Sequence, residues 1–272
     1  MNRRALLAIM RKDLKVAMQN KGVVLPLIIL PVVLFVVIPW VLMLVPSAGG
    51  SSGSLESQLP QLLAAMPPSM ARQLAGHTPG QQVSIYMLVY AFAPMFLILP
   101  VMVSSVLAAD SFAGEKERKT IEALLYTPLK DRDLFTAKLL GPWLAAVMLG
   151  LFSFGLYAVM VDLAGWVAMK EILLPNWMWV LLALWVSPAV AGLGLVAMVF
   201  VSARAQGFQD AYQTGGLVVL PILVLFAAQI TGVMFFTVGA VFLLGLALWI
   251  VLIFLLRWAS RSFVREQLMP RG

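Results

Sequence analysis

The sequence predicts an all-α integral membrane protein with six transmembrane helices, and three observations lead to this class. First, 62% of the 272 residues are hydrophobic and only 11% are charged, about half the charge of a soluble domain. Second, several uncharged apolar runs are long enough to cross a bilayer. Third, the charges gather near the chain ends and in one stretch between the second and third runs. We expect one transmembrane domain over residues 1–272.

The first element, residues 1–21, is typical of a basic amphipathic helix. Apolar side chains recur every four residues from Leu6 to Met18, and the segment carries six Lys or Arg residues. Such a helix lies in the headgroup region of an anionic leaflet, so we expect membrane lipid as its partner. The alternative is a signal peptide, but the apolar run over residues 22–45 is too long for its hydrophobic region and no clear cleavage site follows. We therefore expect a retained first span.

Residues 46–82 change character and predict an external loop. The run SAGGSSGS indicates a flexible linker, and the rest places Leu, Met and Ala between Pro and Gly. We expect one or two short helices lying on the outer surface. His77 has no acidic or histidine neighbour in the sequence, so we interpret it as a solvated loop residue.

The second and third spans follow on either side of the charged stretch. Residues 83–109 carry no charge, and residues 139–161 form the next apolar run. We expect residues 162–171 to be a short loop with Trp166 at the membrane interface.

The last three spans come from two longer uncharged runs. The first covers residues 172–203 and exceeds the length of one span, so we expect residues 175–179 to run along the interface before the fourth span begins near Val180. The second, residues 211–256, has the length of a helical hairpin, with its turn near residues 229–232. Small residues, including Gly192 and Gly194, allow close helix contact within one chain or between two.

The charged stretch, residues 110–128, predicts a short helix with a small apolar face. Charges of alternating sign at helical spacing favour a helix, and Pro128 ends it. Ile121, Leu124 and Leu125 form the apolar face. The alternatives are a solvated loop with ordinary ion pairs and a helix that docks on a partner, and composition alone favours neither.

The distribution of Lys and Arg orients the six spans. Only Arg72 and Lys170, of 19 Lys and Arg residues, lie on the far side in this arrangement. The positive-inside rule then places both termini and the charged stretch in the cytoplasm. The net charge of +7 therefore belongs to membrane topology, and we expect no nucleic-acid partner.

Several kinds of chemistry are excluded by residue content. The chain has no cysteine and one histidine, which rules out cysteine nucleophiles and clusters of histidine ligands on a metal. It has no Walker A, HExxH or GxSxG pattern. No ionisable residue lies clearly inside a span, which argues against a proton relay. We expect no catalytic residue, no metal site and no cofactor in this chain.

The charged stretch also carries a resemblance to a known family. The segment SFAGEKERKTIEALLYTPLKDRDLFTAK resembles the cytoplasmic loop of type-2 ABC transporter permeases, in which AGE-x-E precedes T-x-E-x-L-L-x-T-P-L. The matching residues are Ala113, Gly114, Glu115, Glu117, Thr120, Glu122, Leu124, Leu125, Thr127, Pro128 and Leu129. The N-terminal run RKDLKVAMQNKGVVLPLIILPVVLF is similar to the entry of the sodium-export and related permeases. The external loop is shorter than in many relatives, so no substrate is carried over from them.

This resemblance implies the permease subunit of an ATP-driven exporter in a bacterial or archaeal cytoplasmic membrane. ATP and Mg would bind to a separate ABC ATPase subunit, present in two copies, and substrate would pass between two permease chains, identical or homologous. Residues 110–135 would hold the coupling helix between the second and third spans. Its polar residues would contact the ATPase around the apolar face or brace the loop against the membrane helices. The contact residues would be Glu115, Glu117, Arg118, Ile121, Leu124 and Leu125.

The resemblance further implies that the second and fifth spans line the substrate pathway. The candidate residues there are Tyr86, Tyr90, Ser104, Tyr212 and Gln213. Two other classes of function stay open at this point. One is a non-transporting membrane assembly module, and the other is a self-sufficient channel or secondary carrier.

Overall fold

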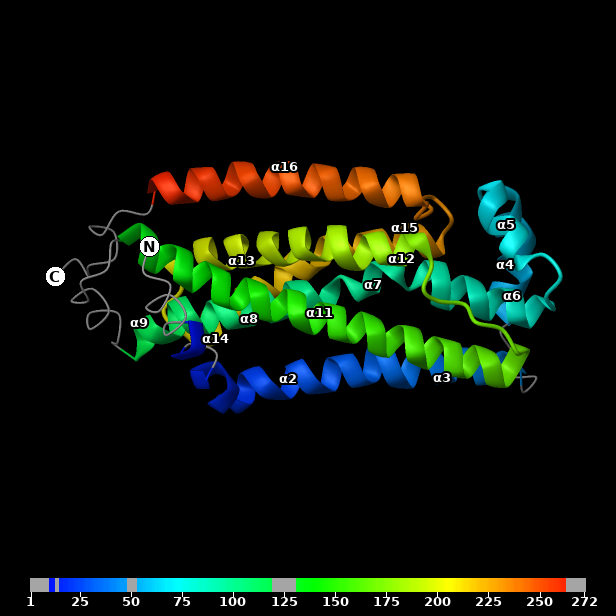
Figure 1. Ribbon diagram of the computed structural model, residues 1–272, viewed down its shortest axis with the longest axis horizontal. Coiled ribbons are helices and arrows are strands. Elements are labelled where there is room, and N and C mark those ends of the chain that lie inside the picture. Colours follow the sequence, from blue (N-terminus) through cyan, green and yellow to red (C-terminus); the bar gives the residue numbers. More distant parts are fainter. Residues whose placement is uncertain (1–9, 13–14, 48–52, 119–130, 263–272) are drawn as a thin grey trace.

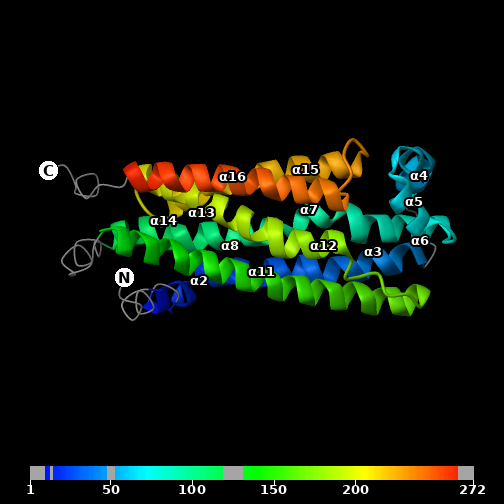
Figure 2. The ribbon, with the colours of Figure 1, turned by 45° about the horizontal axis from the view of Figure 1, so that its top comes forward.

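The computed structural model describes residues 10–12, 15–47, 53–118 and 131–262, and every regular element in these ranges is a helix. The long helices form an elongated bundle (Figure 1). Short helices α4 (Gly53–Ala65), α5 (Pro68–Leu74) and α6 (Pro79–Ile85) gather at one end in both views (Figure 1 and Figure 2). At the other end lie α9 (Glu115–Glu117) and α14 (Phe208–Gly215) (Figure 1). Within these described ranges, six helices are long and apolar enough to cross a membrane, which agrees with the predicted number of spans.

The N-terminal segment is helical wherever the structure describes it, at residues 10–12 and 15–19. Met10 and Ala17 are buried, whereas Met18 is 62% exposed. The buried face of this segment therefore departs from the predicted four-residue spacing at Met18, where Ala17 is buried instead. The other residues of the expected interfacial helix lie outside the described part of the chain.

The first span begins after Asn20, whose side-chain oxygen accepts a hydrogen bond from the Gly22 N–H. It consists of α2 (Lys21–Val32), a π-helical turn η1 (Val33–Val37) and α3 (Ile38–Ser47). Two prolines lie inside α2 and remove backbone donors there.

The external segment folds into three short helices, α4 (Gly53–Ala65), α5 (Pro68–Leu74) and α6 (Pro79–Ile85). The predicted short helices are present, but they number three among the described residues and not one or two, and α6 leads directly into the second span. The interpretation of His77 as a solvated residue without an acidic partner is wrong. Its Nε2 lies 3.1 Å from a carboxylate oxygen of Glu171, which is 94 residues away in the chain, and its side chain is only 15% exposed.

The second span is irregular and longer than predicted. After α6 it continues through η2 (Tyr86–Ala91), α7 (Ala93–Phe96), α8 (Ile98–Ala109), the π-helical turn η3 (Asp110–Gly114) and α9 (Glu115–Glu117). The first part of the charged stretch is thus a continuation of this span. Residues 110–117 are helical because the backbone hydrogen bonding of the second span continues beyond Ala109, the last residue of α8. The remainder, residues 119–130, lies outside the described residues.

Helix α11 (Asp131–Met169) contains 39 residues and is about 58 Å long at 1.5 Å per residue. It exceeds the thickness of a bilayer core. The predicted loop over residues 162–171 is therefore wrong in its first eight positions. Asp162 does not end the helix, because its side chain accepts hydrogen bonds of 2.9 Å from the backbone N–H groups of Leu173 and Leu174.

The fourth span begins at residue 177, three residues earlier than predicted. Asn176 caps α12 (Trp177–Leu181) by accepting a hydrogen bond from the Trp179 N–H, and η4 (Leu182–Val186) and α13 (Ser187–Arg204) follow. The expectation that residues 175–179 run along the interface fails at Trp179, which is fully buried.

The last two spans form the expected hairpin. Its first arm is α14 (Phe208–Gly215), η5 (Gly216–Val219) and α15 (Leu220–Ile230), and its second arm is α16 (Val238–Ser262). Gly232 supplies a positive φ of 72° in the connecting turn, a conformation that glycine adopts without strain.

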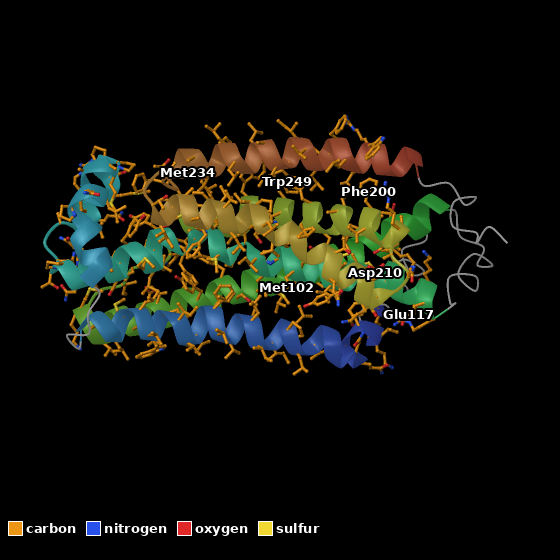
Figure 3. The ribbon with its side chains drawn as sticks, turned by 180° about the vertical axis from the view of Figure 1, so that it is seen from behind. Met102, Glu117, Phe200, Asp210, Met234 and Trp249 are labelled. Atoms are coloured by element: carbon orange, nitrogen blue, oxygen red, sulfur yellow. The ribbon has the colours of Figure 1, made fainter. Side chains whose placement is uncertain are left out.

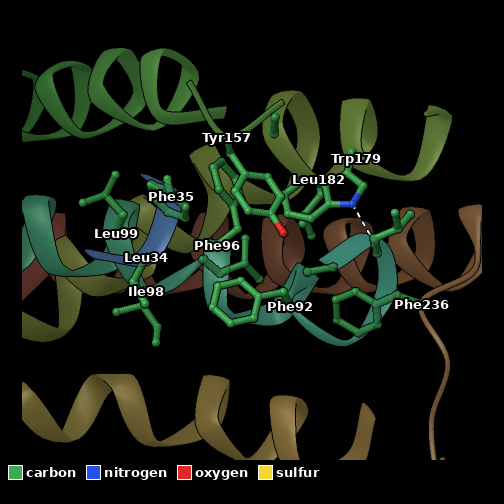
Figure 4. Packing of buried hydrophobic residues seen from close by; sticks show 14 of the residues in the cluster. Leu34, Phe35, Phe92, Phe96, Ile98, Leu99, Tyr157, Trp179, Leu182 and Phe236 are labelled. Carbon is green, nitrogen blue, oxygen red and sulfur yellow. Dashed lines mark hydrogen bonds between the residues drawn. The ribbon is translucent and has the colours of Figure 1, made fainter. Parts of the chain in front are cut away.

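The centre of the bundle is the pair α8 and α13, which pack side by side. The second and fourth spans are 83% and 67% buried, whereas the fifth and sixth are 17% buried. Aromatic side chains fill the space beside this pair, among them Phe96, Tyr157 and Trp179 (Figure 4). The outer faces of the peripheral spans are apolar and exposed, as lipid contact requires.

Small residues allow the close approach of these central helices. A Cβ on Gly194 would lie 3.1 Å from the backbone oxygen of Val101 and 3.0 Å from the Ser105 hydroxyl. Gly192 likewise meets Leu252 within the same chain. The structure therefore uses both glycines for packing inside one subunit.

Gly194→Val should destabilise the bundle by about 1–3 kcal/mol, because the added atoms force α13 away from α8. Gly155→Val is the matched control, since nothing lies within 4 Å of a Cβ at that position of α11. The free energies of unfolding of both variants, measured in detergent, check the prediction. Equal losses would show that the cost comes from valine in a helix and not from crowding.

Candidate functional site

Four segments meet at the end of the bundle opposite α4 to α6. They are the N-terminal segment, the end of the second span, the start of α11 and the connection between α13 and α14. Glu117 and Asp210 mark this end in Figure 3. We call the charged contacts among the four segments the charged junction, made of Lys12, Asp110, Glu115, Lys116, Glu117, Arg118 and Lys138.

Glu115 is the centre of the charged junction. One carboxylate oxygen lies 2.5 Å from the Lys138 Nζ and the other lies 2.6 Å from the Lys12 Nζ. The side chains of Glu115 and Lys138 are only 4% and 8% exposed, while Lys12 is 46% exposed. A buried carboxylate needs such partners, because an unpaired charge out of water costs several kcal/mol.

Lys138 makes further contacts that fix its position. Its Nζ donates a 2.8 Å hydrogen bond to the Ser111 carbonyl oxygen and lies 5.4 Å from the centre of the Phe112 ring. The second span and α11 are therefore joined by an ion pair, a hydrogen bond and a cation–π contact within one turn of helix.

A second ion pair closes the end of the second span on itself. The Arg118 guanidinium donates to the Asp110 side chain at 3.1 Å and to the Asp110 carbonyl oxygen at 3.2 Å. Gly114 lies beneath this pair, where a Cβ would come within 3.0 Å of the Asp110 carboxylate. The glycine therefore lets the guanidinium reach across the backbone.

Two residues of α9 connect it to the start of α14. The Glu117 carboxylate accepts a 2.9 Å hydrogen bond from the Phe208 N–H, and the Lys116 Nζ donates to the Ala205 carbonyl oxygen at 3.0 Å. Gly207, the residue before α14, has no side chain to cap the helix, and Glu117 supplies the capping oxygen instead. A carboxylate is favoured at a helix N-terminus. The end of the second span is thereby coupled to the fifth.

Three of the residues predicted to contact a partner belong to this junction. Glu115, Glu117 and Arg118 are held by contacts within the chain, and Glu115 is buried. Both predicted roles of these three residues, contact with the ATPase and bracing of the loop, stay predictions. Ile121, Leu124 and Leu125 lie outside the described residues, so their docking role stays a prediction.

The predicted pathway residues are not gathered in one place. Tyr86, Tyr90 and Ser104 are buried inside the subunit, and Ser104 donates to the Val101 carbonyl oxygen of its own helix. Tyr212 is half-buried and Gln213 is exposed. Their roles along a substrate pathway stay predictions.

Sequence reasoning missed the partners of Glu115. In the sequence, Lys12 and Lys138 stand out only as two of the basic residues that orient the spans. A signal existed for Lys138, because a lysine at the entry of an apolar span needs a partner when its helix continues into the membrane. Nothing in the sequence identified that partner, which is 23 residues away.

Comparison with known proteins gives one match. The family model for "ABC-2 family transporter protein" matches residues 7–266, nearly the whole chain. Searches of curated proteins and of solved structures found no match.

Proposed function

The chain belongs to the ABC-2 family of transporter proteins and is a membrane subunit of a transporter, and from this premise we propose that it exports substrate with energy from ATP. The ATP and Mg would bind to a separate ABC ATPase, present in two copies. Two permease chains, identical or homologous, would enclose the substrate path. The charged junction is the observation that supports this proposal best.

The junction has the properties that a transmitting element needs. It ties the end of the central second span to the N-terminal segment, to α11 and to α14 through polar contacts. Its buried pair restrains the backbone from which the 119–130 segment leaves. A force applied to that segment would therefore reach the second, third and fifth spans together. The apolar residues Ile121, Leu124 and Leu125 would supply the surface that receives the force.

The orientation of the chain is part of the proposal. The junction would face the cytoplasm and α4 to α6 the exterior, since cytoplasmic ends of spans carry the excess of Lys and Arg. The membrane would be the cytoplasmic membrane of a bacterium or archaeon. A partner ATPase in the cytoplasm would then meet the end of the bundle that carries the charge.

The test compares variants in a complex purified with its ATPase. Glu115→Gln should lower substrate-stimulated ATP hydrolysis about tenfold, because hydrogen bonds between charged groups contribute about 1.5–3 kcal/mol. Lys116→Ala, at the next position, removes one hydrogen bond of an exposed side chain and should have the smaller effect, about twofold to threefold. Leu125→Ala should weaken ATPase binding while the protein still reaches the membrane, since burying a leucine contributes about 1.5–3 kcal/mol.

The outcomes separate the possible functions. If Glu115→Gln and Leu125→Ala both leave ATPase binding and hydrolysis unchanged, the charged junction only stabilises the subunit and the proposed coupling role is wrong. If no ATPase associates with the chain, a self-sufficient carrier or an assembly module replaces the proposal.

A further inference from the structure

The second span is interrupted near the end of the bundle that carries α4 to α6. In η2 the Phe92 N–H bonds five residues back, to the Met87 carbonyl oxygen at 2.8 Å. Pro94 has no N–H, so the Tyr90 carbonyl oxygen loses the donor that a regular α-helix would give it. The carbonyl groups of residues 88–90 instead accept hydrogen bonds from side chains of other spans.

Three different spans supply these donors. The Tyr157 hydroxyl donates to residue 88 and the Trp179 indole to residue 89, each at 2.7 Å. The Gln229 side-chain amide donates to residue 90 at 3.1 Å. The interrupted segment is thereby attached to the third, fourth and fifth spans.

The attachment to the fifth span runs in both directions. The Tyr86 hydroxyl donates to the Gln229 carbonyl oxygen at 2.5 Å, while the Gln229 side chain donates to the Tyr90 carbonyl oxygen. The Tyr90 hydroxyl in turn donates to the side chain of Gln73 on α5. We call the set Gln73, Tyr86, Tyr90 and Gln229 the Gln229 clasp.

The fifth span packs against fewer elements of the bundle at this end than the third span does, so the clasp is a larger part of its contacts. Helix α11 packs against α8, α3 and α13, whereas the main contacts of α15 outside its own span are with α7 and η2. The fifth span is only 17% buried. Apart from the clasp, its contact with the second span includes the edge-to-face pair of Phe226 and Phe92, which lies between η2 and α7. The clasp supplies polar contacts that hold this end of α15 against the second span.

The closed clasp carries a penalty that opening would relieve. Gln229 is fully buried, and its Oε1 has no hydrogen-bond partner among the described residues. A buried acceptor without a donor is unfavourable, since water would satisfy it in an open state. Two interhelical hydrogen bonds therefore stabilise the closed clasp, whereas hydration of the Gln229 Oε1 favours the open state.

We propose that the Gln229 clasp is the outer gate of the subunit, which opens when the fifth span separates from the second as substrate leaves. The second and third spans stay together during this movement. The gating role rests on the proposed export function, whereas the clasp itself is a property of the isolated chain. Tyr86 and Gln229 are positioning residues, and they act by holding α15 against η2.

The first experiment uses purified permease in lipid nanodiscs without an ATPase. Phe92→Cys/Phe226→Cys places a thiol pair across the second and fifth spans, where the rings are 6.2 Å apart. Phe96→Cys/Phe154→Cys is the matched control across the second and third spans, at 6.3 Å. The chain has no cysteine of its own, so a short bis-methanethiosulfonate bridges only the engineered pairs. It forms one disulfide with each thiol, releases methanesulfinate, and is removed by reduction.

Adding Tyr86→Phe should lower the bridging rate of the first pair about threefold to tenfold and leave the control pair unchanged. Tyr157→Phe removes a similar hydrogen bond, but to the third span, and should leave the rate of the first pair unchanged. Gln229→Leu is a second variant. It removes the donor to the Tyr90 carbonyl oxygen together with the unpartnered Oε1, so the bridging rate should fall by less than in Tyr86→Phe. Equal rates in Tyr86→Phe, Gln229→Leu and the unmodified background would overturn the clasp.

The second experiment measures ATP-driven transport in the reconstituted complex. Bridging Phe92→Cys to Phe226→Cys should abolish transport, and reduction should restore it, while bridging the control pair leaves transport intact. Full transport with the first pair bridged would overturn the gate. An unbridged complex without ATP-driven activity would contradict the proposed function instead, and the bridging rates would still decide the clasp.

Discussion

Lys138→Met should lower the free energy of unfolding by about 3–5 kcal/mol, because it removes the buried partner of the Glu115 carboxylate. Lys12→Met removes the other lysine, which is 46% exposed, and should cost only about 1 kcal/mol. Unfolding of both variants in mixed detergent micelles measures the difference.

A double variant separates the cost of an unpaired charge at Glu115 from the loss of side-chain packing at Lys138. Replacing both partners, as in Lys138→Met/Glu115→Leu, should recover much of the lost stability, since apolar replacement of a whole buried pair is often neutral. The recovered protein should still fail in ATP-driven transport. Equal losses from Lys138→Met and Lys12→Met would show that burial does not strengthen the inner pair.

Trp179→Ala should destabilise the subunit by about 3–5 kcal/mol, because it leaves a large cavity in the core. The ring centre of Trp179 lies 4.8 Å from that of Tyr157 and 5.7 Å from that of Phe96, and its indole N–H bonds the Val89 carbonyl oxygen. Trp177→Ala is the matched control two residues earlier, where the side chain is 76% exposed. It should change the stability by less than about 0.5 kcal/mol.

Thermal unfolding of the two tryptophan variants checks this prediction. Trp179→Phe should recover part of the loss, since it restores most of the ring contacts but not the hydrogen bond. A loss from Trp177→Ala as large as that from Trp179→Ala would contradict the assignment of Trp179 to the core.

The six spans could be predicted because each contains an uncharged run of sufficient length. Their ends could not be predicted, because a charge at the end of a run does not show whether the helix stops. Asp162 lies within α11 and binds the backbone of Leu173 and Leu174. Trp179 resembles an interfacial tryptophan in sequence, yet its indole finds a partner in the interrupted second span.

The candidate site could be predicted only in part. The charged stretch drew attention to Glu115, Glu117 and Arg118 because charge is rare in this chain. Their contacts depend on residues far away in sequence, such as Lys12, which is 103 positions from Glu115. The Gln229 clasp had no comparable signal. The sequence predicts Tyr86 and Tyr90 as pathway residues and Gln229 as part of a turn, and no pattern links the three.

Helix α11 also limits how far the second and third spans can rotate relative to each other. It is attached to the second span at Lys138 and again at Tyr157, 19 residues later and therefore about 28 Å along the helix axis. If the donor–acceptor distance of each hydrogen bond can vary by about 0.5 Å, the two attachments limit the relative rotation of these spans to about 2°. They form a stiff frame, so a displacement of the second span at the charged junction would move the third span with it as far as η2.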